Sequence, residues 1–162
     1  MDMVTATAGE AGMLGVILAA AGSFALIGLA LYVLLIVAQW KIFTKAGEPG
    51  WKSLIPIYNM YTQVKFTWSG KAFWQMLAFS VLSGVCESVA SSFGEEQAFL
   101  ALIFGLAALV FSVIFLVMNI RATHKLSKSF GHGAGFTVGL LFLPNIFMLI
   151  LGFGSDQYLG PQ

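Results

Sequence analysis

The sequence is 162 residues long, and its composition excludes an ordinary soluble domain. Hydrophobic residues make up 59% of it and charged residues only 9%, whereas soluble domains are about 25% charged. The single cysteine, Cys86, forms no intrachain disulfide, and no Cys/His cluster has metal-ligand spacing, so we expect no metal and no other cofactor. The net charge of +1 indicates no nucleic-acid partner, and we expect none.

Hydrophobic segments in chain order predict an all-α integral membrane protein with one membrane domain over residues 1–162. A hydrocarbon core near 30 Å needs a helix of about 20 apolar residues. A cleaved signal peptide is the alternative for the first segment, but its leader has no Lys or Arg and its apolar run is too long. Segment 72–92 is the least apolar, and Pro144 is tolerable in the last one. The four expected transmembrane helices are residues 13–38, 72–92, 98–118 and 134–153.

The charges predict an orientation for these helices. All eight Lys and Arg residues lie in segments 39–71 and 119–133, and six of the seven acids lie outside them. Basic loops stay in the cytoplasm. We therefore expect a multi-pass protein of the cell's inner membrane, with both termini and the tight turn at 93–97 on the non-cytoplasmic side. An even number of crossings keeps the two basic loops on one face.

Several stretches carry a resemblance to a known family. They are residues 40–59, from Trp40 to Asn59, and the shorter runs 124–131, 139–147 and 158–161. Over about residues 40–161 the chain resembles a family of small bacterial multi-span membrane proteins classed as a domain of unknown function. The resemblance implies a membrane location and no established activity, although some members carry an automatic label of signal peptidase I.

A Ser/Lys peptidase needs a serine activated by a lysine on the outer side of the membrane. The Lys-Ser pairs of this chain, such as Lys52-Ser53, lie in the segments expected to be cytoplasmic, and no outward segment contains lysine. We therefore expect no enzyme, and a membrane-embedded peptidase is the least favoured function.

The segment after the first span predicts an interfacial or re-entrant loop, because tryptophans and lysines mix there as they do at a membrane surface. Trp68 belongs to the same mixture. The loop is either a structural anchor that sets helix depth, which we favour, or a docking surface for a partner or headgroup. Its candidate residues are Trp40, Trp51, Pro56, Tyr58 and Asn59.

The second span carries a polar stripe at helical spacing, which should face helices, another subunit or water rather than lipid. Its acid is either an ion or proton site or, as we favour, a hydrated group near the outer interface. The residues are Ser80, Ser83, Gly84, Glu87, Ser88 and Ser91.

A basic face follows the third span, where Arg121, Lys125 and Lys128 repeat at i, i+4 and i+7. Contact with anionic lipid headgroups is favoured over a dedicated ligand site. Small residues also repeat every four positions, at 15, 19 and 23 and at 135 and 139, either to pack the helices together or to join copies.

These features favour a non-enzymatic scaffold or accessory subunit of a membrane complex or homo-oligomer, with membrane lipids as its other partners. A small channel or transporter that uses the polar stripe is the alternative, but the other spans offer few polar residues for a pathway.

Overall fold

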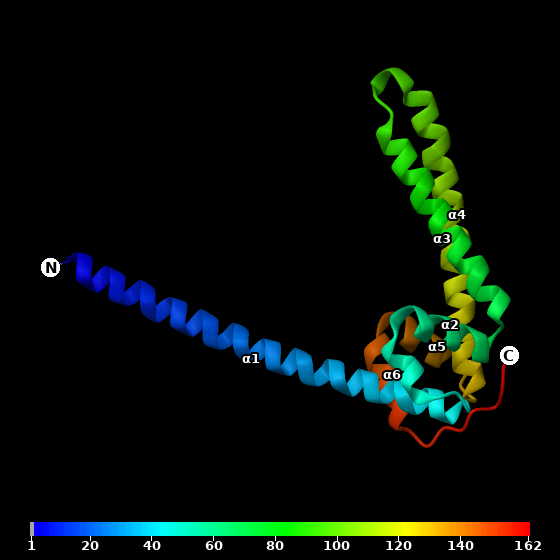
Figure 1. The fold of residues 1–162 in the computed structure, drawn as a ribbon, viewed down its shortest axis with the longest axis horizontal. Coiled ribbons are helices and arrows are strands. Elements are labelled where there is room, and N and C mark those ends of the chain that lie inside the picture. The colour runs from blue at the N-terminus through cyan, green and yellow to red at the C-terminus, as the bar shows by residue number, and fades with distance from the viewer. Residues whose placement is uncertain (1) are drawn as a thin grey trace.

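The computed structural model describes the backbone of residues 2–162 and the side chains of residues 12–162, and its regular structure over this range is helical. Two arms leave a small packed unit in different directions (Figure 1). We call this unit, residues 38–71 and 119–162, the basal unit. The helices are α1 (Asp2–Lys45), η1 (Gly50–Leu54), α2 (Pro56–Thr67), α3 (Gly70–Ser92), η2 (Glu95–Gln97), α4 (Ala98–Ser129), α5 (Ala134–Phe142) and α6 (Pro144–Phe153).

Three helical segments in the described part of the chain are long and apolar enough to cross a membrane. They are Gly12–Lys45, Gly70–Ser92 and Glu95–Ser129. At 1.5 Å per residue even the shortest, with 23 residues, extends about 34 Å. The first three of the expected spans therefore coincide with helices of sufficient length, including the weakly apolar second one.

The arm formed by α3 and α4 is an antiparallel hairpin. Its two helices pack along their length, with the rings of Phe79 and Phe111 6.2 Å apart and Ser83 donating its hydroxyl to the carbonyl of Ala108 at 3.1 Å. The short helix η2 closes the hairpin, so the tight turn expected at 93–97 is confirmed.

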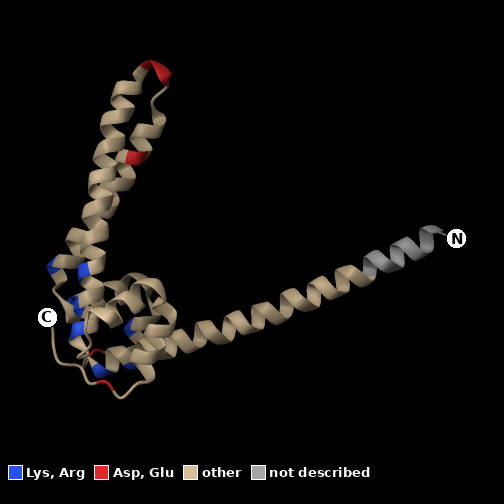
Figure 2. Ribbon diagram, turned by 180° about the vertical axis from the view of Figure 1, so that it is seen from behind, with Lys and Arg blue, Asp and Glu red and all other residues tan. Residues whose placement is uncertain are grey.

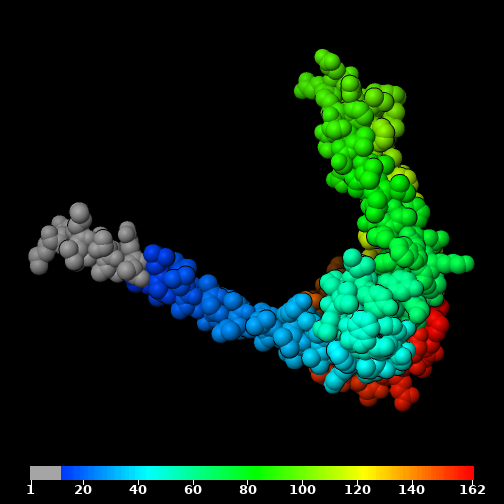
Figure 3. Space-filling model, viewed as in Figure 1, coloured from blue at the N-terminus to red at the C-terminus, as the bar shows by residue number. Residues whose placement is uncertain are grey.

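The other arm is α1 alone. Its main neighbours are α6 and η1, which contact only its C-terminal end. Every residue from 12 to 34 is exposed, and the space-filling view shows this stretch as an isolated rod (Figure 3). The candidate spans therefore do not close into one bundle.

A single transmembrane helix over 134–153 is not confirmed. Helix α5 ends and α6 begins at Leu143, whose φ of −131° and ψ of 56° are not helical, and the proline at 144 starts the new helix. The ring of Phe147 packs directly against Gly139, so the chain bends sharply between the two. With 9 and 10 residues, each helix extends only about 14 to 15 Å, half of a hydrocarbon core.

The two basic segments are helical rather than loops. Segment 39–71 forms the end of α1, then η1 and α2, and no re-entrant loop is confirmed. Helix α4 continues past Met118 to Ser129, because Leu126 and Phe130 face the core of the basal unit while the charged side chains face outward.

The basal unit has its own hydrophobic core, built from segments far apart in the sequence. α1, α2, α4, α5 and α6 each contribute, and Tyr158 of the tail packs against it. α1 and α6 approach so closely that a Cβ added at Gly152 would lie 2.7 Å from the backbone of Ala38. The buried core residues are Ile42, Phe43, Phe66, Leu126, Phe130, Leu140 and Leu151.

Two glycines end the helices that lead into this core. Gly47 after α1 and Gly131 after α4 have φ of 77° and 79°, which side chains with a Cβ adopt poorly. In each case the following amide bonds back five residues, Glu48 to the carbonyl of Phe43 and His132 to that of Ser127. This is the Schellman arrangement, which turns the chain back onto the core.

The last residue lies among the basic side chains. The amide of Gln162 donates to the carbonyl of Thr67 at 3.1 Å, and Lys125 donates to the carbonyl of Gln162. The expected location of both termini on the face opposite the basic segments is therefore not confirmed. The two basic segments lie together in the basal unit, because the hairpin of α3 and α4 between them returns the chain to its starting end.

Candidate functional site

The Lys and Arg residues gather in the basal unit, and acidic residues mark the far end of the hairpin (Figure 2). Within the basal unit each of the two acids lies beside a Lys or His side chain. Glu48 pairs with Lys52, and with Lys65 at 3.4 Å, while Asp156 lies 3.2 Å from the Nε2 of His132. Lys45 is also held, because it donates to the carbonyls of Leu151 and Gly154 at 2.7 and 2.8 Å.

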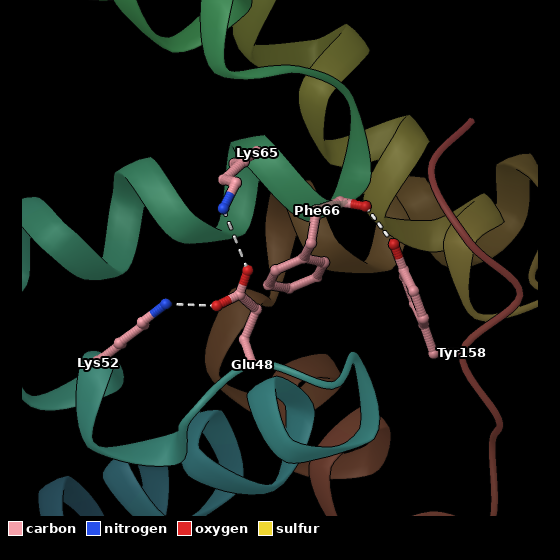
Figure 4. Close-up of polar contacts among 5 residues, drawn as sticks. All are labelled: Glu48, Lys52, Lys65, Phe66 and Tyr158. Carbon is pink, nitrogen blue, oxygen red and sulfur yellow. Dashed lines mark hydrogen bonds and ion pairs between the residues drawn. The ribbon is translucent and has the colours of Figure 1, made fainter.

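Glu48 is the bridge between the first two short helices (Figure 4). Its hydrogen bond with Lys52 is the main reason that the pKa of the Glu48 carboxyl is lowered, and the same bond raises the pKa of Lys52. The pair links the end of α1 to η1, and the bond to Lys65 extends it to α2. These ion pairs connect helices, and the charges of Lys52 and Lys65 are compensated by Glu48.

The basic face predicted after the third span forms a real pocket at the end of α4. Arg121, Lys125 and Lys128 line a cavity of about 380 Å³ together with Ile120, His124 and Gln162. No acidic side chain lies among these lining residues. The face is therefore an open, positively charged hollow rather than a scatter of surface charges.

Trp68, from the connection between α2 and α3, orders two of these cations. The Arg121 guanidinium carbon lies 5.6 Å and the Lys125 Nζ 5.2 Å from the centre of its ring. Both distances are within the range in which a ring face attracts a cation. On the other side of the pocket, His124 shares a 2.9 Å hydrogen bond with Thr137 of α5. Side chains from α4, from α5 and from the connection between α2 and α3 thus contact the lining of the pocket.

The residues of the expected interfacial segment lie together beside α1. Trp51 stacks on Tyr58 with ring centres 5.9 Å apart, and the Trp40 indole covers Gly50. Pro56 is the first residue of α2. Asn59 donates to Gln39 and, at 3.2 Å, to the carbonyl of Ser53. Asn59 therefore satisfies backbone and side-chain acceptors where η1 meets α1.

The polar stripe of the second span is only partly gathered. Ser83 and Glu87 line a groove of about 350 Å³ against Ser112 of α4. Ser80, Gly84, Ser88 and Ser91 are exposed on the outside of the hairpin, and Ser91 donates to the carbonyl of Ser88 in its own helix. The hairpin by itself therefore encloses no path along this stripe.

The small-residue repeats have different positions. On α1, Gly15, Ala19 and Ser23 are exposed, and the Ser23 hydroxyl donates to the carbonyl of Ala19 at 2.9 Å. Gly139 receives the ring of Phe147, whereas nothing lies within 4 Å of a Cβ built at Gly135. Among side chains 12–162, no three His, Cys, Asp or Glu residues gather as metal ligands would.

The sequence did not predict the roles of two residues that line the basic pocket, His124 and Gln162, or of Trp68, which contacts two of its cations. Trp68 was an interfacial tryptophan without a partner, Gln162 belonged to a tail expected on the other face, and His124 was a neighbour of the basic face without a role. The i, i+4, i+7 spacing predicted that the three cations share one helix face. The local sequence does not predict the contact of the tail with Lys125 or the contact of Trp68 with α4.

The fold and composition define an all-helical protein with three candidate membrane-spanning helices and a basic, helical basal unit. Residues 51–161, more than half of the chain, match the Family of unknown function (DUF5684). The chain belongs to this family, and the resemblance seen in the sequence is confirmed. The match covers the basal unit beyond α1 and the whole hairpin. No curated protein and no solved structure matches the chain.

Proposed function

We propose that the protein is a non-enzymatic membrane scaffold or accessory subunit, whose three long helices cross the inner membrane and hold the basal unit at the cytoplasmic surface. The location of every Lys and Arg at one end of all three helices supports this orientation. The N-terminus then faces outward, the hairpin turn also faces outward, and residue 162 faces the cytoplasm.

The observation that carries the scaffold role is the isolation of α1. Every residue from 12 to 34 is exposed, and this arm and the hairpin diverge from the basal unit (Figure 1). Helices in a membrane associate through close packing of small residues, and one face of α1 offers such residues at 15, 19 and 23. We infer that a helix of a second copy or of another subunit packs in the open wedge beside α1.

The apolar side chains beside α1 support a role for η1 and α2 at the membrane interface. Trp51, Leu54, Ile55 and Ile57 are all exposed, and they adjoin the end of the proposed first crossing. Aromatic and aliphatic side chains at this depth partition into the interfacial layer. The segment then sets the depth of the basal unit, as an anchor would.

A non-enzymatic role is supported by the environment of the serines. Across the described side chains, no lysine donates to a serine hydroxyl, and the lysines with hydrogen bonds use carboxylate or carbonyl oxygens. Ser53 is buried beside a lysine that Glu48 holds. A serine nucleophile needs a base within hydrogen-bond reach.

Cysteine crosslinking in native membranes tests the scaffold role. In a Cys86→Ser background, Ala19→Cys lies on the small-residue face of α1, and Ala21→Cys lies about 200° around the helix as a matched control. We expect crosslinked species from Ala19→Cys and few from Ala21→Cys, with the partner identified by mass spectrometry. A protein that is monomeric in mild detergent and crosslinks at neither position contradicts the scaffold role.

The groove between α3 and α4 supports a second candidate, a small channel or transporter assembled from several copies. Glu87 is exposed in that groove, near Ser83 and Ser112, and intramembrane acids mark ion pathways in many transporters. Flux through reconstituted protein that falls with Glu87→Gln, but not with Glu95→Gln in the turn, is the expected result of that candidate. Flux unchanged by Glu87→Gln removes its support.

A further inference from the structure

We propose that the pocket lined by Arg121, Lys125 and Lys128 binds the phosphate of one anionic phospholipid headgroup, and that the ring of Trp68 positions two of these cations. The inference deepens the proposed function, because it rests on the basal unit lying at the membrane surface. It assigns a ligand class to a defined cavity of about 380 Å³, which is more than a general attraction of basic residues to lipid.

The charge balance supports an anion in this pocket. Of the acids of the basal unit, Glu48 is paired with Lys52 and Lys65, and Asp156 lies beside His132. Neither acid belongs to the pocket lining. The pocket lining includes three cations and no acid. Lys125 donates to the main-chain oxygen of Gln162, which also lines the pocket.

The depth of the pocket fits the headgroup layer. Helix α4 begins at Ala98, and about 20 residues take it across a hydrocarbon core near 30 Å, to about residue 118. Arg121 then lies about 5 Å beyond that boundary and Lys125 about 10 Å beyond it. A headgroup layer of about 5 to 8 Å on each side places a phosphate between these two side chains.

The ordering of the cations by Trp68 makes this a site rather than a diffuse surface. The centre of its ring lies 5.6 Å from the Arg121 guanidinium carbon and 5.2 Å from the Lys125 Nζ. Contact with one ring keeps the two charges close to each other before a ligand binds. A guanidinium and an ammonium in fixed positions suit a phosphate, which accepts several hydrogen bonds. Less side-chain entropy is then lost on binding.

The experiment uses the full chain in nanodiscs of phosphatidylcholine with increasing phosphatidylglycerol, and counts retained anionic lipid by native mass spectrometry. We expect Lys125→Gln or Arg121→Gln to lower the affinity for the retained lipid about fivefold each, the equivalent of one charge near the surface. The matched control is Lys71→Gln, which removes an exposed lysine outside the pocket lining and should change it little.

Trp68→Leu separates a site from diffuse attraction, because it keeps every charge. A site predicts weaker lipid retention, with the helical content and melting temperature of the variant measured alongside. Equal losses in Lys71→Gln and Lys125→Gln overturn the proposal, as does unchanged retention in a folded Trp68→Leu protein. Displacement of the lipid by millimolar-range inorganic phosphate would assign the pocket to a free anion and also overturn it. None of these outcomes depends on a protein partner, so the scaffold role is tested separately.

Discussion

The side chain of Tyr158 ties the tail to the rest of the basal unit. Its hydroxyl donates to the carbonyl of Phe66 in α2, and its ring lies 5.8 Å from Phe66 and 5.7 Å from Phe130, the residue that follows α4. Burial raises the pKa of the phenol, so it remains a donor at neutral pH. The tail thereby bridges two helices that are separated by the whole hairpin in the sequence.

Tyr158→Phe should therefore lower the free energy of unfolding by about 1 kcal/mol, the usual net value of one hydrogen bond. Tyr158→Ala should cost several times more, because it also removes the ring between two aromatic neighbours. Thermal unfolding of the detergent-solubilised protein measures both. A Phe variant as unstable as the Ala variant would show that the hydroxyl, and not the ring packing, holds the tail.

Glu48 predicts a pH dependence of stability. Its folded-state pKa lies below the ordinary value of 4.5, so the unfolded chain takes up a proton before the folded chain does. The stabilisation from the Lys52 and Lys65 pairs is therefore present above about pH 4.5 and is lost as the pH falls through the folded-state pKa.

Glu48→Gln should thus flatten the fall in melting temperature between about pH 6 and about pH 3.5. The control is Glu95→Gln in the hairpin turn, which should retain the wild-type slope. A Glu48→Gln protein that loses stability on acidification as steeply as wild type would contradict this role for the pair.

Single residues of the basic pocket illustrate how far sequence reasoning reaches. The spacing of Arg121, Lys125 and Lys128 on one helix face follows from the 3.6-residue period alone. Trp68 reaches them only because α2 and α4 pack together, which is a tertiary property. The aromatic pattern of the sequence therefore indicated a segment at the membrane interface, but it did not predict the contact of Trp68 with Arg121 and Lys125.

At the scale of the elements, the crossing of α1 over α6 depends on the absence of a side chain at Gly152. A Cβ there meets backbone atoms of Ala38, which move less readily than the end of a side chain. The α1 arm is attached to the basal unit mainly through this crossing and η1.

Gly152→Ala should therefore destabilise the basal unit by about 1 to 3 kcal/mol, the usual cost of overpacking. Gly84→Ala is the matched control, since nothing lies within 4 Å of its added Cβ, and the better helix propensity of alanine should leave stability unchanged or slightly higher. Melting temperatures of the two variants compare them. Equal effects would contradict the close crossing.

The hydrophobic pattern predicted the long helices because each has an apolar run that exceeds a bilayer core. It did not predict the break in segment 134–153, whose composition is as apolar as that of a true span. The bend arises from Pro144 together with the fit of Phe147 onto Gly139. Likewise, the pattern ended the third span at Met118, although the helix itself continues as an amphipathic one.

At the scale of the whole molecule, we propose three crossings, whereas the sequence analysis expected an even number in order to keep the two basic segments on one face. An even total is not needed for this, because the two candidate spans between the basic segments, α3 and α4, are enough to return the chain to the same face. Whether the chain crosses again after α4 is a separate matter. The hydrogen bonds of residue 162 with Thr67 and Lys125 argue against a further crossing after α4.

The measurement that tests this account most directly is the labelling of single cysteines in intact cells by a membrane-impermeant maleimide, in the Cys86→Ser background. We predict that Glu96→Cys in the hairpin turn is labelled in intact cells, and that Gln162→Cys is labelled only after the membrane is permeabilised. Labelling of Gln162→Cys in intact cells would restore a fourth crossing and contradict the account.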